Sequence, residues 1–112
     1  MTPSDIAYEM EQVLTHLDGL VVDMREAGAK LAITERDYKV GFARSRMKVR
    51  AGGERATVDA VNDQATVENS DELFAYTVAQ QHLTVTREAL RAAESRLDAL
   101  RSMGAAIRGA GG

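Results

Sequence analysis

Several features that constrain other proteins are scarce or missing in this chain of 112 residues. It has no cysteine, which excludes a disulfide framework and thiolate chemistry. It has no tryptophan, and its aromatic rings come from three tyrosines and two phenylalanines. No apolar run approaches the roughly 18 residues of a membrane span, and no basic-then-apolar leader opens the chain. We therefore expect a cytoplasmic protein.

The single proline stands at position 3, where it cannot interrupt a helix. The apolar residues are mostly Ala, Val, Leu and Met, a composition that favours an all-α protein. In two long stretches, mainly apolar residues recur at steps of three and four, which is the spacing of the packing seam of a coiled-coil or bundle helix. The first seam comprises Ile6, Met10, Val13, Leu17, Leu20, Met24, Ala27 and Leu31, followed more weakly by Thr34, Tyr38, Gly41 and Ser45. The second seam comprises Tyr76, Ala79, Leu83, Thr86, Leu90, Ala93, Leu97, Leu100, Gly104 and Ile107.

Start and stop signals separate these stretches. Thr2 and Asp5 have the spacing of a capping box, which predicts a helix that begins at once. The Ala-Gly-Gly of residues 51–53 predicts its end, because glycine takes the left-handed conformation of a C-cap readily. Thr57 is the expected N-cap of a short helix that reaches about Thr66. The Asn-Ser-Asp-Glu of residues 69–72 is the next start signal.

These signals predict two long antiparallel helices, a helical hairpin, with a short connecting helix. We expect residues 1–108 to form a single helical domain and residues 109–112, which are rich in glycine, to form a flexible tail. Alanine and threonine at core positions pack thinly within one hairpin. We therefore expect a homo-oligomer assembled through coiled-coil-like seams.

Positive charge is concentrated in one band of an otherwise acidic chain. Residues 39–55 hold six basic side chains against one acidic, whereas residues 1–38 hold three against eight and residues 56–112 hold five against eight. The band consists of Lys39, Arg44, Arg46, Lys48, Arg50 and Arg55. Like charges four apart on a helix repel, so an anionic partner is expected nearby.

Two interpretations of the band remain open. In the first, these six residues contact the phosphates of a single nucleic-acid strand. In the second, they pair with the chain's own carboxylates and form a solvated surface. Tyr38 and Phe42 lie four residues apart beside the band, where they either offer stacking surfaces for bases or form a core pair.

No constellation for catalysis or metal binding stands out. His16 and His82 are far apart in sequence and lack partners at ligand spacing. The glycine pair at positions 52–53 lacks the Lys-Ser/Thr of a phosphate-binding loop, and the serines and threonines occupy caps or seam positions. We expect neither an enzyme nor a cofactor or metal site.

Three segments are similar to one known family. They are YKVGFARSRMKV (38–49), ATVDAVNDQATVENSDELFAYTVAQ (56–80) and LDALRSMGAAIR (97–108). From about Glu35 to Arg108 the chain resembles the UvsY-type recombination mediators of phages. The resemblance implies a small oligomeric α-protein that binds single-stranded DNA and helps a recombinase displace single-strand-binding protein. It places Arg44 and Arg46 at two basic positions that the family uses for the strand.

Three hypotheses follow, and the resemblance favours the first. The first is an oligomeric single-stranded-DNA-binding recombination mediator, which helps to load a recombinase or annealing protein in the host cytoplasm. The second is a helical scaffold or adaptor whose basic band docks an acidic helix of a host or phage protein. The third is an anti-defence protein that sequesters a nucleotide messenger at an oligomer interface.

Overall fold

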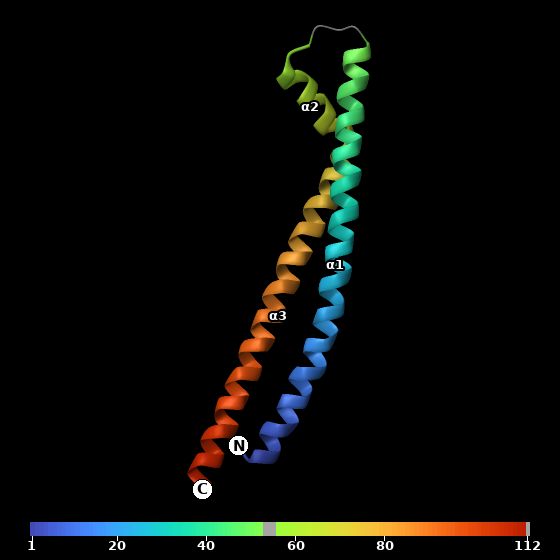
Figure 1. The fold of residues 1–112 in the computed structure, drawn as a ribbon. Coiled ribbons are helices and arrows are strands. Elements are labelled where there is room, and N and C mark those ends of the chain that lie inside the picture. Colours follow the sequence, from blue (N-terminus) through green and yellow to red (C-terminus); the bar gives the residue numbers. More distant parts are fainter. Residues whose placement is uncertain (53–55, 112) are drawn as a thin grey trace. The chain divides into compact units, whose positions relative to one another are not determined.

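The structure, a computed structural model, describes residues 1–52 and 56–111. Every regular element in those two ranges is a helix (Figure 1). The helices are α1 (Pro3–Ala51), α2 (Val58–Glu68) and α3 (Ser70–Gly111). The predicted all-α fold is therefore confirmed.

Helix α1 begins and ends where its flanking residues predict. The backbone N–H of Thr2 donates to Asp5 Oδ2 at 2.9 Å, and the N–H of Asp5 donates to Thr2 Oγ1 at 3.2 Å. This is the reciprocal pair of a capping box. At the other end the N–H of Gly52 donates to the carbonyl of Lys48 at 3.2 Å, just after the last helical residue.

Helix α2 is capped by the hydroxyl of Thr57, which accepts the N–H of Ala60 at 3.1 Å. It extends to Glu68, slightly beyond the predicted end near Thr66. Asn69 is its C-cap, and α3 starts at the next residue. The predicted restart at residues 69–72 is thus confirmed.

Helix α3 continues beyond residue 108, where we placed the start of a tail, and includes Gly111. Alanines at positions 105, 106 and 110 favour the extension, because alanine has the highest helix propensity. The predicted flexibility of residues 109–112 stays a prediction.

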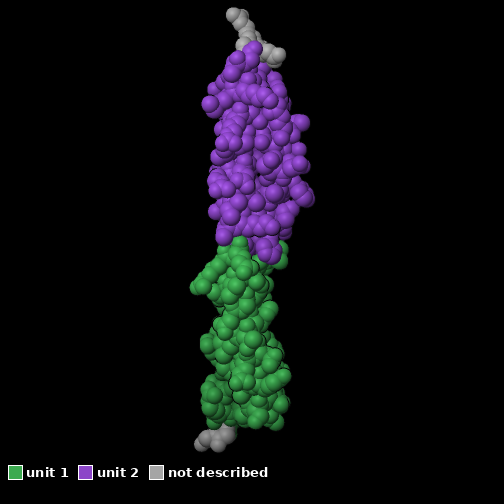
Figure 2. Space-filling model, turned by 90° about the vertical axis from the view of Figure 1, so that its right-hand side faces the viewer, with its two compact units in different colours: residues 1–26, 84–112 green, residues 27–83 purple. Residues whose placement is uncertain are grey.

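The chain divides into two compact units (Figure 2). Each unit contains parts of both long helices. Unit 1 comprises residues 1–26 and 84–112, and unit 2 comprises residues 27–83. The prediction of one helical domain over residues 1–108 stays a prediction.

Unit 1 pairs the first half of α1 with the second half of α3. Glu9 forms an ion pair with Arg96, and a Cβ built on Gly104 would lie 3.8 Å from Cγ2 of Ile6. The two segments therefore run in opposite directions within this unit. The buried residues of unit 1 are Ile6, Leu20, Thr86, Ala93, Leu97 and Leu100.

Unit 2 packs the second half of α1 against α2 and the start of α3. Its core uses mostly small and polar side chains, and Tyr38 stacks on Tyr76 in this unit. The buried residues of unit 2 are Ala27, Thr34, Val61, Ala65, Asn69 and Ala79.

The two predicted seams coincide with the buried side of each long helix. Every seam residue, from Ile6 to Ser45 and from Tyr76 to Ile107, is buried or half-buried. Steps of three and four therefore located the packing side of α1 and α3 correctly, even in the weak segment from Thr34 to Ser45.

Candidate nucleic-acid interface

Five of the six predicted site residues lie on the last part of α1 in unit 2. Four of them, Lys39, Arg44, Lys48 and Arg50, are exposed, and Arg46 is half-buried. Arg55 lies outside the described residues.

The first basic residue of the band is neutralised within the chain. Lys39 Nζ lies 2.6 Å from Glu35 Oε1, one helical turn away. This hydrogen bond, with the negative charge of Glu35, raises the pKa of Lys39. Just before it, Arg36 donates to Asp37 Oδ1 at 3.1 Å. At the start of the band, Lys39 therefore agrees with the second interpretation, in which the basic residues pair with the chain's own carboxylates.

The next cations lack such partners. Among residues 1–52 and 56–111, no ion pair involves Arg44, Lys48 or Arg50. Lys48 lies near Glu68, whose pKa is lowered mainly by a hydrogen bond from Gln64, then by Ser45, and least by the charge of Lys48. Three exposed positive charges are thus available at the end of α1.

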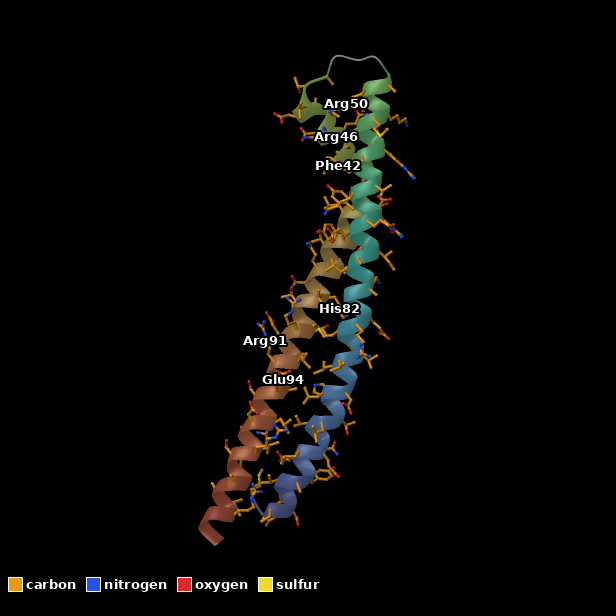
Figure 3. The ribbon with its side chains drawn as sticks, in the orientation of Figure 1. Phe42, Arg46, Arg50, His82, Arg91 and Glu94 are labelled. Carbon is orange, nitrogen blue, oxygen red and sulfur yellow. The ribbon has the colours of Figure 1, made fainter. Side chains whose placement is uncertain are left out.

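Arg46 is arranged differently from its neighbours. Its guanidinium carbon lies 6.0 Å from the ring centroid of Phe42, a cation–π contact. Its Nε is buried and has no hydrogen-bond partner in the structure. Figure 3 shows Phe42, Arg46 and Arg50 in the part of unit 2 where α1 runs beside α2. Packing therefore restrains Arg46 more than the other band residues.

The aromatic residues beside the band contact each other. The rings of Tyr38 and Phe42 are 5.9 Å apart at their centroids, and Tyr38 lies 6.1 Å from Tyr76 with an interplanar angle of 29°. With Arg46 over Phe42, these half-buried side chains form a row of contacts in unit 2, in which Tyr38 and Tyr76 stack and Tyr38 and Phe42 are tilted. This arrangement favours the core interpretation of Tyr38 and Phe42 over base stacking.

The helical phase separates the two arginines that the sequence grouped together. Arg44 and Arg46 are two residues apart, which places them roughly 200° from each other around α1. Arg44 lines a hollow of about 540 Å³, which two carboxylates also line; its other lining residues are Arg36, Asp37, Val40, Gly41, Asn69 and Glu72. The band therefore has two sides, with Arg44 on one and Arg46 and Arg50 on the other.

Asn69 supports this region, and sequence reasoning missed its role. Its Nδ2 donates to Ser45 Oγ at 2.9 Å and to the carbonyl of Ala65 at 2.8 Å. The side chain is buried against Gly41, where an added Cβ would collide with its Oδ1. The amide thus joins the α2–α3 junction to α1 beside the band. The only signal in the sequence was an asparagine at a helix boundary, which we read as part of a start signal.

Other kinds of site find no support in the described part of the chain. In residues 1–52 and 56–111, no group of three or more Asp, Glu or His side chains is placed to hold a metal ion. None of the described helices has the length and hydropathy required to cross a bilayer.

No protein-family model matches the chain, and comparisons with curated proteins and with solved structures found no match. The resemblance to UvsY-type mediators therefore depends on the three sequence segments alone.

Proposed function

We propose that this chain is a homo-oligomeric protein that binds single-stranded DNA through the end of α1 in unit 2. The observation that carries the proposal is the set of exposed cations Arg44, Lys48 and Arg50, which form no ion pair with the described residues. Lysine and arginine bind a strand by displacing its condensed counterions. Cations already paired with carboxylates, such as Lys39, gain less from that exchange.

The proposal includes an assembly. The two long helices form a hairpin, and copies associate so that the bands of several copies line one track. Once one copy has bound the strand, the band of the next copy meets the strand at a high effective concentration. This gain offsets the repulsion between the strand and a protein whose net charge is −3 per copy. The thin cores of both units support this assembly, since only four large aliphatic residues besides Val61 are buried among the described residues: Ile6, Leu20, Leu97 and Leu100.

The biological role in the proposal comes from the resemblance. A strand-binding oligomer of the UvsY type would help a recombinase displace single-strand-binding protein in the cytoplasm. The basic segment 38–49 carries that part of the proposal, because it contains Arg44 and Arg46.

A fluorescence-anisotropy titration of an oligonucleotide at low salt tests strand binding. The double variant Arg44→Ala/Lys48→Ala, which removes two exposed and unpaired cations, should bind at least tenfold more weakly than the wild type. The matched control Arg36→Ala/Lys39→Ala removes two cations that are already paired, and its affinity should change less. Equal binding by the wild type and the first variant, with the oligomer intact, would rule out this mechanism.

A protein scaffold is the second candidate, and one observation favours it. Beside the band, the apolar side chains of Ile33, Val40 and Met47 are exposed. Exposed apolar groups flanked by cations suit an acidic amphipathic helix of another protein. This candidate predicts no strand binding at low salt and a stable complex with a protein partner in a pull-down.

A further inference from the structure

A pocket of about 240 Å³ lies in unit 1, between the start of α1 and the end of α3. These two helix ends lie side by side in Figure 1. Most of the pocket is apolar, and its apolar lining consists of Pro3, Ile6, Ala7, Met10, Gly104 and Ile107. Two arginines, Arg101 and Arg108, complete the lining. We call this space the α1–α3 pocket.

Gly104 contributes space to the pocket where another residue would place a side chain. A Cβ built on it would lie 3.8 Å from Cγ2 of Ile6 and 3.6 Å from Nη1 of Arg108. Both are ordinary van der Waals distances, so this position accommodates a Cβ. Glycine inside a helix costs about 0.5–1 kcal/mol relative to alanine. The glycine therefore keeps open a space that an apolar side chain and a guanidinium border.

The lining of the pocket contains cations and no carboxylate. Among residues 1–52 and 56–111, no ion pair involves Arg108. Arg101 Nη1 lies 3.7 Å from Asp98 Oδ1, which is too long for a hydrogen bond, and both side chains are mostly exposed. Residues 99–112 contain no Asp or Glu. Both guanidiniums are therefore available to an anion in the pocket.

The acidic residues of α1 nearest in sequence to the lining do not neutralise these arginines. The carboxylate of Asp5 accepts the N–H of Thr2, and Glu9 is held in an ion pair with Arg96. Glu11 is exposed and does not line the pocket. The partial positive charge at the start of α1 and the partial negative charge at the end of α3 oppose each other. The two arginines therefore set the sign of the charge at the pocket.

The size of the pocket limits which anions it suits. Sites that cover a drug-sized ligand measure about 300–1,000 Å³. This pocket is smaller, and four of its lining residues, Pro3, Ala7, Arg101 and Arg108, are exposed. It therefore covers one apolar group beside a negative charge. A long fatty acid would leave much of its hydrocarbon chain in water, which is unfavourable.

The chemistry of the lining narrows the choice further. No lining residue is aromatic, so a nucleobase would find no ring on which to stack. A free amino acid would bring its ammonium group towards two arginines. The C-terminal residue of a polypeptide has the carboxylate without that ammonium, and the backbone before it continues into water. A chain terminus with an aliphatic last residue therefore fits both the apolar lining and the charge.

We propose that the α1–α3 pocket binds the C-terminal residue of a partner protein whose chain ends in an aliphatic side chain. That side chain packs against Ile6, Met10 and Ile107, and its carboxylate accepts hydrogen bonds from Arg101 and Arg108. Capture of a chain terminus by its carboxylate is a recurring mode of peptide recognition. The pocket belongs to unit 1 and the basic band to unit 2, so this site goes beyond the proposed strand binding and does not rest on it.

Two fluorescent peptides test the pocket. Both have the sequence Gly-Ser-Gly-Ser-Leu, and one ends in a carboxylate whereas the other ends in an amide. In an anisotropy titration the carboxylate peptide should bind the wild type about tenfold more tightly, because only it makes charge-assisted hydrogen bonds to the arginines. In a methyl NMR spectrum it should shift the resonance of Met10, which lines the pocket, and leave that of Met47, in unit 2, unchanged.

Three variants separate the charge from the space. Arg108→Gln should bind the carboxylate peptide about tenfold more weakly and the amide peptide as the wild type does. Arg91→Gln is the matched control, since it makes the same change at an exposed residue of α3 outside the pocket, and it should bind like the wild type. Gly104→Leu fills the pocket and should weaken both peptides. Circular dichroism should show its helicity intact, because leucine is a better helix former than glycine.

Several results would overturn the proposal. They are no binding of either peptide up to about 1 mM, equal binding of the two peptides, and unchanged binding by Gly104→Leu. Displacement of the peptide by octanoate at a lower concentration than by unlabelled peptide would assign the pocket to a fatty acid instead. Displacement by an oligonucleotide would assign it to nucleic acid.

Strand binding is measured separately with the same proteins. Arg108→Gln and Gly104→Leu keep every cation of the band, so both should bind an oligonucleotide like the wild type. Failure of the peptide site is therefore distinguishable from failure of the proposed DNA binding.

Discussion

The side-chain amide of Asn69 occupies the space beside Gly41 where any other residue would place its Cβ. The amide is held there by hydrogen bonds to Ser45 Oγ and to the carbonyl of Ala65. This contact lets the α2–α3 junction approach α1 closely, next to Arg44. The weaker end of the first seam, at Gly41 and Ser45, therefore packs against Asn69.

Gly41→Ala should destabilise unit 2 by about 1–3 kcal/mol, because the new methyl group displaces a buried, hydrogen-bonded amide. The control Gly28→Ala should stabilise the protein by about 0.5–1 kcal/mol, since nothing lies within 4 Å of its added Cβ and alanine is the better helix former. Chemical denaturation measures both values. A more stable Gly41→Ala variant would show that Asn69 does not fill this space.

Thr57→Ala should lower the free energy of unfolding by about 1 kcal/mol, because the N–H of Ala60 loses its acceptor at the start of α2. Hydrogen exchange at Ala60 should accelerate. Thr15→Ala is the matched control, since its hydroxyl only donates to the carbonyl of Glu11 within an exposed part of α1. The cap assignment fails if the two variants have the same stability.

Stability should fall in acid partly through Asp5. The backbone N–H of Thr2, and then its hydroxyl, hold the pKa of Asp5 below its ordinary value. The contribution of the ionised carboxylate is complete above the ordinary aspartate pKa of about 3.9, and it is lost as the pH falls through the lower folded pKa. Asp5→Asn should therefore flatten the dependence of stability on pH below that value. Denaturation at a series of acidic pH values checks this, and an unchanged slope would contradict it.

Local signals in the sequence predicted the helices well. The capping box of Thr2 and Asp5 and the cap at Thr57 each act within one turn, so they fix a boundary without help from distant residues. Helix α1 ends next to Gly52 as predicted, but Gly52 does not take the left-handed conformation of a C-cap, and Gly53 lies outside the described residues. Seam periodicity located the buried side of α1 and α3 because burial follows helical phase.

The candidate site was harder to predict, because its properties depend on neighbours in space. The sequence shows Arg44 and Arg46 as members of one band, but their environments differ, because Arg46 lies over Phe42 and Arg44 lines a hollow with Asn69. The pairing of Lys39 with Glu35 was compatible with either interpretation of the band until side-chain geometry was available. The role of Asn69 was missed for the same reason, since its hydrogen-bond partner Ser45 lies 24 residues away in the sequence.

The salt dependence of oligonucleotide binding tests the central claim most directly. Each phosphate contact on a single strand contributes about −0.7 to the slope of log affinity against log salt concentration. The triple variant Arg44→Ala/Lys48→Ala/Arg50→Ala should therefore have a slope about 2 units shallower per copy than the wild type. A wild-type slope near zero, or equal slopes for the two proteins, would contradict the proposal that these cations contact the strand.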